Sequence, residues 1–143
     1  MLTMNYILKT STSDILNVIS DDKALALFKI IASANDNNND NDSDTLRTKT
    51  KFTRKQYYSR MYNLINVGLI KRKGGNYSLT SFGKAIYEAQ RIVEDAVNNY
   101  YWKLKVIDSA QLSKEISIKE YTKLVDILID NQKINEIMAA GSF

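Results

Sequence analysis

Residues 52–83 decide the fold, and they read FTRKQYYSRMYNLINVGLIKRKGGNYSLTSFG. Thr53 and Gln56 match a capping box, in which the Thr hydroxyl and the Gln side chain satisfy free backbone amides at a helix start. Apolar side chains follow at helical spacing, and we expect them to be buried: Tyr57, Met61, Leu64 and Ile65. Gly68 favours the end of the helix because glycine adopts the left-handed closing conformation. We therefore predict a helix over residues 53–67.

The opposite face of this helix is polar, aromatic and basic. Lys55, Ser59, Tyr62 and Asn66 recur there at helical steps, with Tyr58 at the edge and Arg54 in the open first turn. The two tyrosines are as easily explained by cover of neighbouring apolar surface as by contact with a ligand.

A β-hairpin is predicted over residues 69–80, because two short β-prone runs flank the turn formed by residues 74–76. Its first strand carries Lys71, Arg72 and Lys73 in succession. Three adjacent like charges repel one another unless something neutralises them, which favours an anionic partner.

The region 81–143 is predicted to hold two long amphipathic helices. The first begins after Thr80 or Ser81 and extends to about residue 107, with a seam of close to 3.5-residue period formed by Phe82, Ile86, Ala89, Val93, Ala96 and Tyr100. The second covers residues 117–140 and opens with a capping box of Ser117 and Glu120. The seam can pack within the chain or between subunits, and we expect region 81–143 to form a homodimer.

Before residues 52–83, apolar spacing predicts short helices over residues 14–18 and 20–34, and we expect residues 35–44, which are rich in Asn and Asp, to form a surface loop with nothing to bury. Residues 45–51 favour another short helix, although their threonines leave a strand open. We assign residues 1–80 to one domain, the loop included.

The basic residues are concentrated in one segment. Between Thr45 and Tyr87 there are ten Lys or Arg and no Asp or Glu, whereas the rest of the chain holds the other ten basic residues and all 16 acidic ones. Such asymmetry is typical of a surface that meets phosphates, because neutralising them releases counterions. A solvated surface face usually mixes both signs.

Several classes of function are excluded or disfavoured. The chain has no Cys and no His, which removes disulfides, Cys/His zinc sites and imidazole bases. The carboxylates are scattered and no phosphate-binding glycine loop is present, so we expect no enzyme, no cofactor and no metal. The apolar runs are too short for a membrane span, and we expect a cytoplasmic protein. The sequence identifies no small-molecule effector.

Residues 44–87, and 52–83 in particular, resemble the archaeal winged-helix family of transcription-regulator-like proteins. The resemblance lies in the helix closing on Gly68-Leu69-Ile70, the basic hairpin, and the run from Leu79 to Gly83, and it covers about a third of the chain. It implies a mainly α fold with a small β-hairpin wing, that is, a winged helix-turn-helix with long C-terminal helices.

The resemblance also implies roles for particular residues. Helix 53–67 would be the recognition helix in the major groove, with base-edge contacts from Arg54, Lys55, Tyr58 and Ser59 and a phosphate contact from Tyr62. The wing, residues 71–77, would contact the backbone or an adjacent minor groove through Lys71, Arg72, Lys73 and Asn76. The preceding helix would bring Arg47, Lys49 and Lys51 against the flanking backbone.

The expected function is therefore a DNA-binding transcriptional regulator acting on double-stranded DNA. The alternative is a winged-helix protein-docking module within a larger assembly, which would use an exposed apolar patch on the C-terminal helices.

Overall fold

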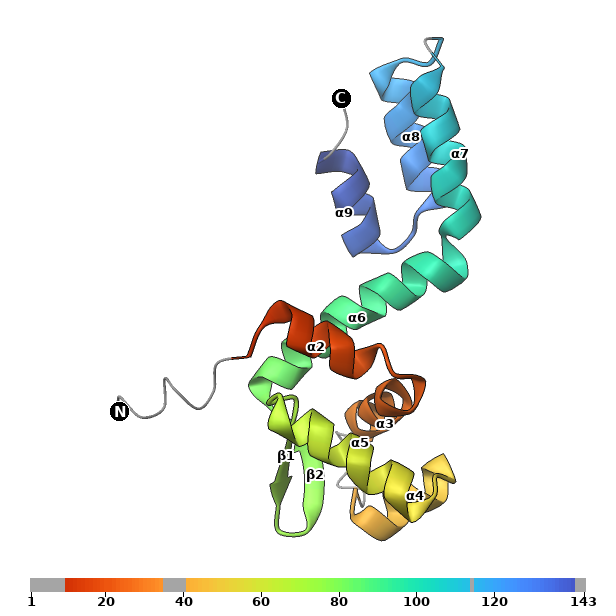
Figure 1. The fold of residues 1–143 in the computed structure, drawn as a ribbon. Helices are drawn as coiled ribbons and strands as arrows, with labels where there is room; N and C mark the ends of the chain where they lie inside the picture. Colours follow the sequence, from red (N-terminus) through yellow and green to blue (C-terminus); the bar gives the residue numbers. More distant parts are fainter. Residues whose placement is uncertain (1–9, 35–40, 114, 141–143) are drawn as a thin grey trace, which may run out of the picture. The chain divides into compact units, whose positions relative to one another are not determined.

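The computed structural model describes residues 10–34, 41–113 and 115–140. By its internal contacts the chain divides into two compact units, Met1–Tyr87 and Glu88–Phe143, hereafter unit 1 and unit 2. The described part is mainly helical and contains one two-stranded antiparallel hairpin (Figure 1), which confirms the coarse fold class expected from the sequence. None of the described helices is long and apolar enough to cross a membrane.

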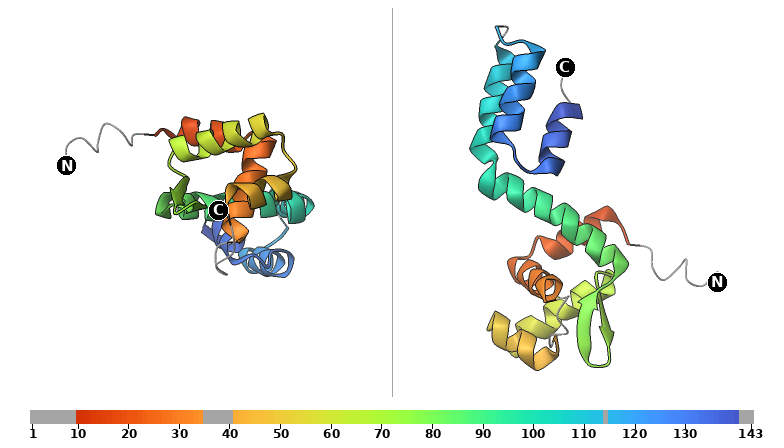
Figure 2. Two further views of the ribbon diagram at one scale, coloured as in Figure 1. Left: turned by 90° about the horizontal axis from the view of Figure 1, so that it is seen from below. Right: turned by 180° about the vertical axis from the view of Figure 1, so that it is seen from behind.

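The described part of unit 1 contains four helices and the hairpin before the start of a longer helix. In chain order these are α2 (Thr12–Ile19), α3 (Asp22–Ser33), α4 (Ser43–Thr50), α5 (Arg54–Asn66), β1 (Ile70–Lys73), β2 (Asn76–Leu79) and α6 (Ser81–Asn99). Residues 45–50 thus belong to a helix, and the alternative of a strand over residues 45–51 was wrong. The hairpin projects from the helices of unit 1, with its turn at the far end (Figures 1 and 2).

Helix α5 forms where the sequence predicts it. The Thr53 hydroxyl accepts a hydrogen bond from the Gln56 amide, and the Gln56 side chain accepts one from the Thr53 amide. The chain leaves the helix at Gly68, whose φ of 85° is in the left-handed region. Tyr57, Met61 and Leu64 are buried, whereas Ile65 is 40% exposed. The prediction for Ile65 was wrong because about 100° per residue turns it out of the core beside Leu64.

The core of unit 1 contains side chains from each of its described helices and from the hairpin. The largest fully buried members are Tyr57, Phe28, Leu27, Ile31, Leu46, Leu64, Leu69 and Ile70. Helix α3 contributes most of one wall and packs on α2, α4, α5 and β2. The core therefore fixes α5 and the hairpin on one small body.

The hairpin has a regular register, in which Ile70 pairs with Leu79 and Arg72 pairs with Tyr77. Alternation places these four residues on one face of the hairpin. Lys71 and Lys73 lie on the other face, opposite Ser78 and Asn76. The three consecutive cations are thus divided between two faces.

The loop predicted at residues 35–44 with nothing to bury is wrong in its last part; residues 35–40 lie outside the described residues. Asn41 is only 5% exposed. Its Nδ2 donates to the carbonyl oxygens of Ile31 (3.3 Å) and Tyr77 (3.1 Å), and its own carbonyl accepts from the Tyr77 amide at 3.0 Å. The Nδ2 group of Asn41 is thus satisfied by carbonyl oxygens of α3 and β2, which offsets the cost of burying it.

Unit 2 shows that the long helix predicted to about residue 107 is interrupted. Helix α6 ends at Asn99, and α7 (Tyr101–Leu112) begins after Tyr100, whose φ of −123° and ψ of 3° are not helical. Asn98 and Asn99 have low helix propensity, and the buried Tyr100 donates its hydroxyl to Asp130. This tertiary contact accompanies the break.

The helix predicted over residues 117–140 is also two helices, α8 (Ile118–Leu128) and α9 (Gln132–Ala140). The capping box of Ser117 and Glu120 is confirmed at the start of α8. Ile129 is extended, and the Asn131 side chain accepts a hydrogen bond from the Ile134 amide at 3.1 Å. Asn131 therefore caps α9 and starts a new helix.

Unit 2 has a core of its own, formed by Tyr100, Ile107, Tyr121, Val125, Ile129 and Ile134. The predicted seam is not buried along its length, since Phe82, Ala89 and Val93 are exposed while Ala96 and Tyr100 pack in this core. Further apolar side chains of unit 2 are exposed, among them Trp102 and Ile127.

Candidate nucleic-acid interface

The outward face of α5 carries the side chains that the sequence assigned to it. Lys55, Ser59, Tyr62 and Asn66 are all exposed, and Tyr62 has 66% of its surface accessible. They project from the side opposite the buried Tyr57 and Leu64, so the core fixes their direction. This face can contact a ligand without any rearrangement of the helix.

Arg54 and Tyr58 form a stack at the start of α5. The Arg54 guanidinium lies 5.9 Å from the centre of the Tyr58 ring, and the Tyr58 ring meets Tyr57 edge-on at 4.9 Å between centroids. Burial raises the pKa of Tyr57, whose hydroxyl donates to the Ser43 hydroxyl at 3.2 Å. The stack is thereby joined to the first turn of α4.

Arg60 differs from the other cations of α5 because it forms an ion pair within unit 1. Its Nε and one terminal nitrogen donate to the two carboxylate oxygens of Asp21, at 3.0 and 3.3 Å. The Arg60 hydrogen bond, followed by that from the Ala24 amide, lowers the pKa of Asp21. This ion pair ties α5 to the start of α3, where Asp21 is the N-cap.

The cations of β1 have two environments. Arg72 lies 5.7 Å from the centre of the Tyr77 ring, on the face that also carries Ile70 and Leu79. Lys71 and Lys73 are exposed on the opposite face. The lysines therefore present free charge, whereas Arg72 also covers an aromatic side chain.

Asn76 is exposed at the end of the hairpin, but its side-chain oxygen accepts a hydrogen bond from the Asn41 amide at 3.2 Å. Residues 41–42 also flank β2 through an antiparallel bridge between Asp42 and Asn76. No role for Asn41 was predicted from the sequence. Asn41 stands directly before Asp42, the N-cap of α4, and is one of several Asn and Asp residues in succession, so the sequence alone does not distinguish it from its neighbours.

The cations predicted for the helix before α5 are dispersed. Arg47 is half-buried and lies 3.9 Å from Asp44, and Lys49 is exposed on α4. Lys51 lies beyond the helix, at its left-handed C-cap with φ 59°. The placement of Lys51 within the helix was therefore wrong by one residue.

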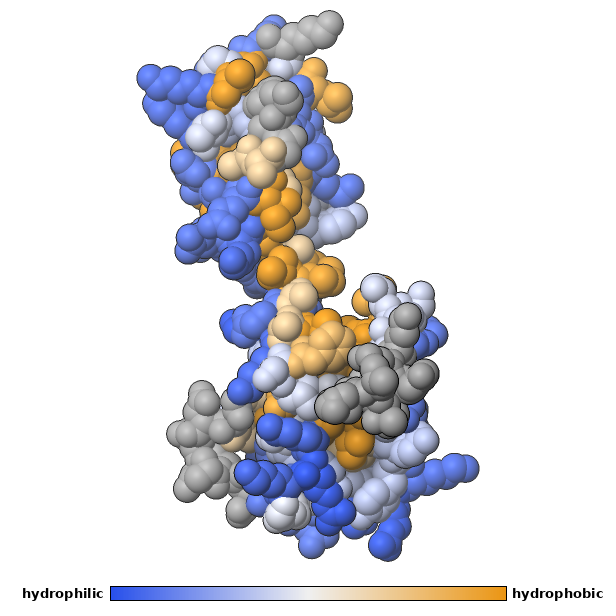
Figure 3. All heavy atoms as spheres, turned by 90° about the vertical axis from the view of Figure 1, so that its left-hand side faces the viewer, coloured by the Kyte–Doolittle hydropathy of each residue, from blue (hydrophilic) through white to orange (hydrophobic). Residues whose placement is uncertain are grey.

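The basic segment keeps most of its charge free. Across residues 10–34, 41–113 and 115–140, its ion pairs are Arg60–Asp21 and Arg47–Asp44. Arg54 and Lys55 on α5 and Lys71 and Lys73 on β1 have no acidic partner in that part of the chain, and α5 contacts β1. On the side drawn in Figure 3, hydrophilic side chains cover the hairpin end of unit 1.

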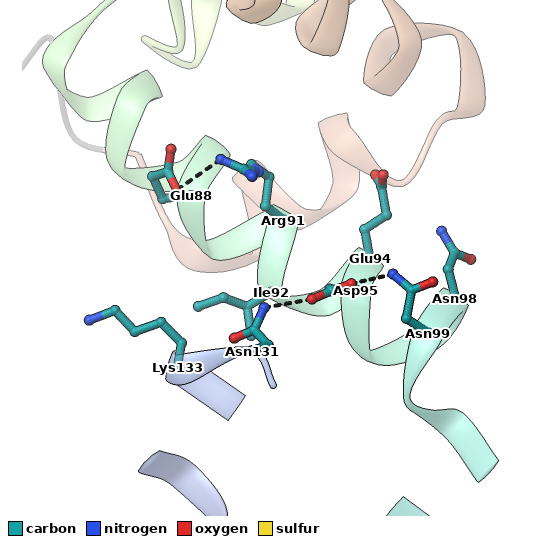
Figure 4. A pocket seen from close by; sticks show the side chains of 9 residues that line it. All are labelled: Glu88, Arg91, Ile92, Glu94, Asp95, Asn98, Asn99, Asn131 and Lys133. Carbon is teal, nitrogen blue, oxygen red and sulfur yellow. Dashed lines mark hydrogen bonds and ion pairs between the residues drawn. The ribbon is translucent and has the colours of Figure 1, made fainter. Parts of the chain in front are cut away.

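A polar pocket in unit 2 offers no comparable chemistry. It is lined by residues of α6 together with Asn131 and Lys133 (Figure 4). Asp95 accepts hydrogen bonds from Asn99 and Asn131, and Glu88 pairs with Arg91 at 3.5 Å. The carboxylates drawn there are thus engaged with neighbouring side chains, and the described residues contain no group of acidic side chains placed to hold a metal ion.

Comparison of the chain with family models, with curated proteins and with solved structures gives no match.

Proposed function

We propose that unit 1 is a winged helix-turn-helix domain and that the protein is a DNA-binding transcriptional regulator. Helix α5 enters the major groove of double-stranded DNA, and the β1–β2 hairpin lies as a wing on the backbone or the minor groove. The supporting observation is that α5 and β1 present unpaired cations from one rigid core.

The charges of the hairpin favour phosphate over a base edge as its target. Lys71 and Lys73 are exposed point charges on flexible stems, which suit phosphate oxygens. Arg54 and Lys55 lie in the first turn of α5, whose backbone amides also favour an anion. Base contacts belong to the exposed face of α5, and backbone contacts to the hairpin.

Unit 2 supplies the second part of the proposal, a homodimer. Its exposed apolar side chains, such as Val93, Val97 and Trp102, favour an interface there (Figure 3 shows apolar patches on this unit). A second copy of the chain would set two α5 helices on one duplex. The same side chains would serve the alternative, a protein-docking module, if the DNA test below fails.

The test is a titration of the protein against random-sequence duplex DNA at several salt concentrations. The double variant Lys71→Ala, Lys73→Ala should bind more weakly. If each lysine neutralises one phosphate, its slope of log affinity against log salt should be shallower by about 2 for each protomer bound, and so by about 4 for the proposed homodimer. The matched control is Lys119→Ala, Lys123→Ala, which removes the same charge from exposed positions on α8 of unit 2.

The control variant should keep the wild-type salt slope. Equal losses in both variants would mean that net charge alone governs binding. Absence of binding by the wild-type protein at low salt would refute the DNA proposal and leave the docking module.

A further inference from the structure

Helix α5 carries an exposed apolar row beside its basic first turn. Tyr58, Tyr62 and Ile65 follow one another at steps of four and three, which places them along one side of the helix. They are 42%, 66% and 40% exposed. A contiguous apolar row on a surface helix is typical of an interaction site, whereas isolated apolar residues are not.

The charges next to the row identify what can cover it. Arg54 and Lys55 lie at its N-terminal end without an acidic partner among the described residues, and Lys71 and Lys73 follow α5 on β1. The partner must therefore be anionic and must also offer apolar groups. A DNA major groove offers both, because phosphates line its edges and thymine methyl groups project from its floor.

The first ring of the row is held in place before any ligand binds. The Tyr58 ring makes a T-shaped contact with the Tyr57 ring, at 4.9 Å between centroids, and its centroid lies 5.9 Å from the Arg54 guanidinium. A side chain that is already ordered loses less freedom on binding, so its apolar surface contributes more to affinity.

We propose that Tyr58, Tyr62 and Ile65 contact thymine methyl groups in the major groove, and that the protein consequently prefers A·T-rich duplex DNA. This inference rests on the proposed function and adds to it the class of base that is read. It also gives Tyr62 a base contact in place of the phosphate contact expected from the sequence.

The experiment compares duplexes that differ only in the methyl group. Alternating dA–dT and alternating dA–dU duplexes of equal length have the same base pairing, phosphates and minor-groove acceptors. The wild-type protein should bind the dU duplex about fourfold more weakly for each thymine methyl contacted, the effect of burying one such group. In alternating dG–dC duplexes, a methyl group added at C5 of cytosine should strengthen binding relative to the unmethylated duplex.

Variants assign the effect to the row. Tyr62→Ala should reduce the discrimination between dT and dU, and the triple variant Tyr58→Ala, Tyr62→Ala, Ile65→Ala should abolish it. The double variant Tyr58→Phe, Tyr62→Phe keeps both rings and should retain the discrimination. Tyr101→Ala, which removes an exposed ring from unit 2, is the matched control and should behave as wild type. Circular dichroism confirms that each variant is folded.

The outcomes separate this inference from the proposed function. Salt-dependent binding with equal affinity for the dT and dU duplexes would overturn the inference and leave the DNA-binding proposal intact. Discrimination that survives the Tyr58→Ala, Tyr62→Ala, Ile65→Ala change would overturn the assignment to this row. No binding to any duplex at low salt would overturn both.

Discussion

The basic residues of unit 1 differ in whether the fold leaves their charge exposed. Because side chains alternate between the two faces of a strand, Lys71 and Lys73 lie on one face of the hairpin and Arg72 lies on the other, beside Tyr77. The exposed polar and aromatic residues of α5 follow from helical spacing, and the sequence predicted them, whereas it wrongly placed Ile65 in the core. The roles of Arg60 and Asn41 did not follow, because their partners Asp21 and Tyr77 lie far away in the sequence.

At the residue scale, the Asp21–Arg60 pair predicts a dependence of stability on pH. The pKa of Asp21 is lowered in the folded state, so its contribution is present at neutral pH and is lost as the pH falls through the folded pKa, below about 4. Asp21→Asn removes the charge but keeps a good N-cap. Because the Asp21 side chain is 41% exposed, we expect a loss of no more than about 1 kcal/mol.

Thermal unfolding between pH 3 and pH 7 measures this effect. The difference in melting temperature between wild type and Asp21→Asn should be largest at neutral pH and should shrink in acid. A difference that stays constant over this range would show that the ion pair does not stabilise the fold.

At the element scale, the helix starts marked by capping boxes were predictable and the interruptions within long helices were not. Capping boxes mark the starts of α5 and α8, and Gly68 marks the end of α5. The apolar period runs through Tyr100 without any Gly or Pro near the break, and the low helix propensity of Asn98 and Asn99 is a weak signal beside it. Asn131 is a residue type that favours a helix N-cap, but the apolar pattern continues over residues 117–140 and therefore predicted a single helix there.

The junction between the hairpin and α6 yields a prediction about Gly83. A β-carbon built on Gly83 would lie 2.1 Å from the carbonyl oxygen of Leu69, which is buried backbone. The Thr80 hydroxyl accepts a hydrogen bond from the Gly83 amide at 2.8 Å and donates one to the Gly68 carbonyl. These bonds hold the start of α6 close to the backbone of Leu69. Gly83→Ala should therefore destabilise the protein by about 1–3 kcal/mol, as overpacking does.

Chemical denaturation with Lys84→Ala as the control measures this cost. Lys84 is the next residue on α6 and is exposed, so its substitution should leave the midpoint unchanged. A wild-type midpoint for Gly83→Ala would mean that α6 can shift away from Leu69 without loss.

At the scale of the whole molecule, the two units have separate cores. The buried cluster of unit 1 includes Leu64 and that of unit 2 includes Ile129, and among the described residues no buried side chain belongs to both clusters. Leu64→Ala and Ile129→Ala should each cost about 2–5 kcal/mol in the unit that they belong to.

Residue-resolved hydrogen exchange tests whether the units open independently. Leu64→Ala should accelerate exchange in α3, α4 and α5, and Ile129→Ala in α7, α8 and α9. Acceleration in both units by either change would show that they unfold as one.

The position of Asn41 beside β2 has a consequence for behaviour at high concentration. A two-stranded sheet has two open edges, each of which can recruit a strand from another molecule and begin aggregation. Residues 41–42 occupy the edge of β2, and the remaining edge belongs to β1, with its Lys-Arg-Lys run. Strands from other copies would meet like charge there, so this hairpin resists growth into fibres.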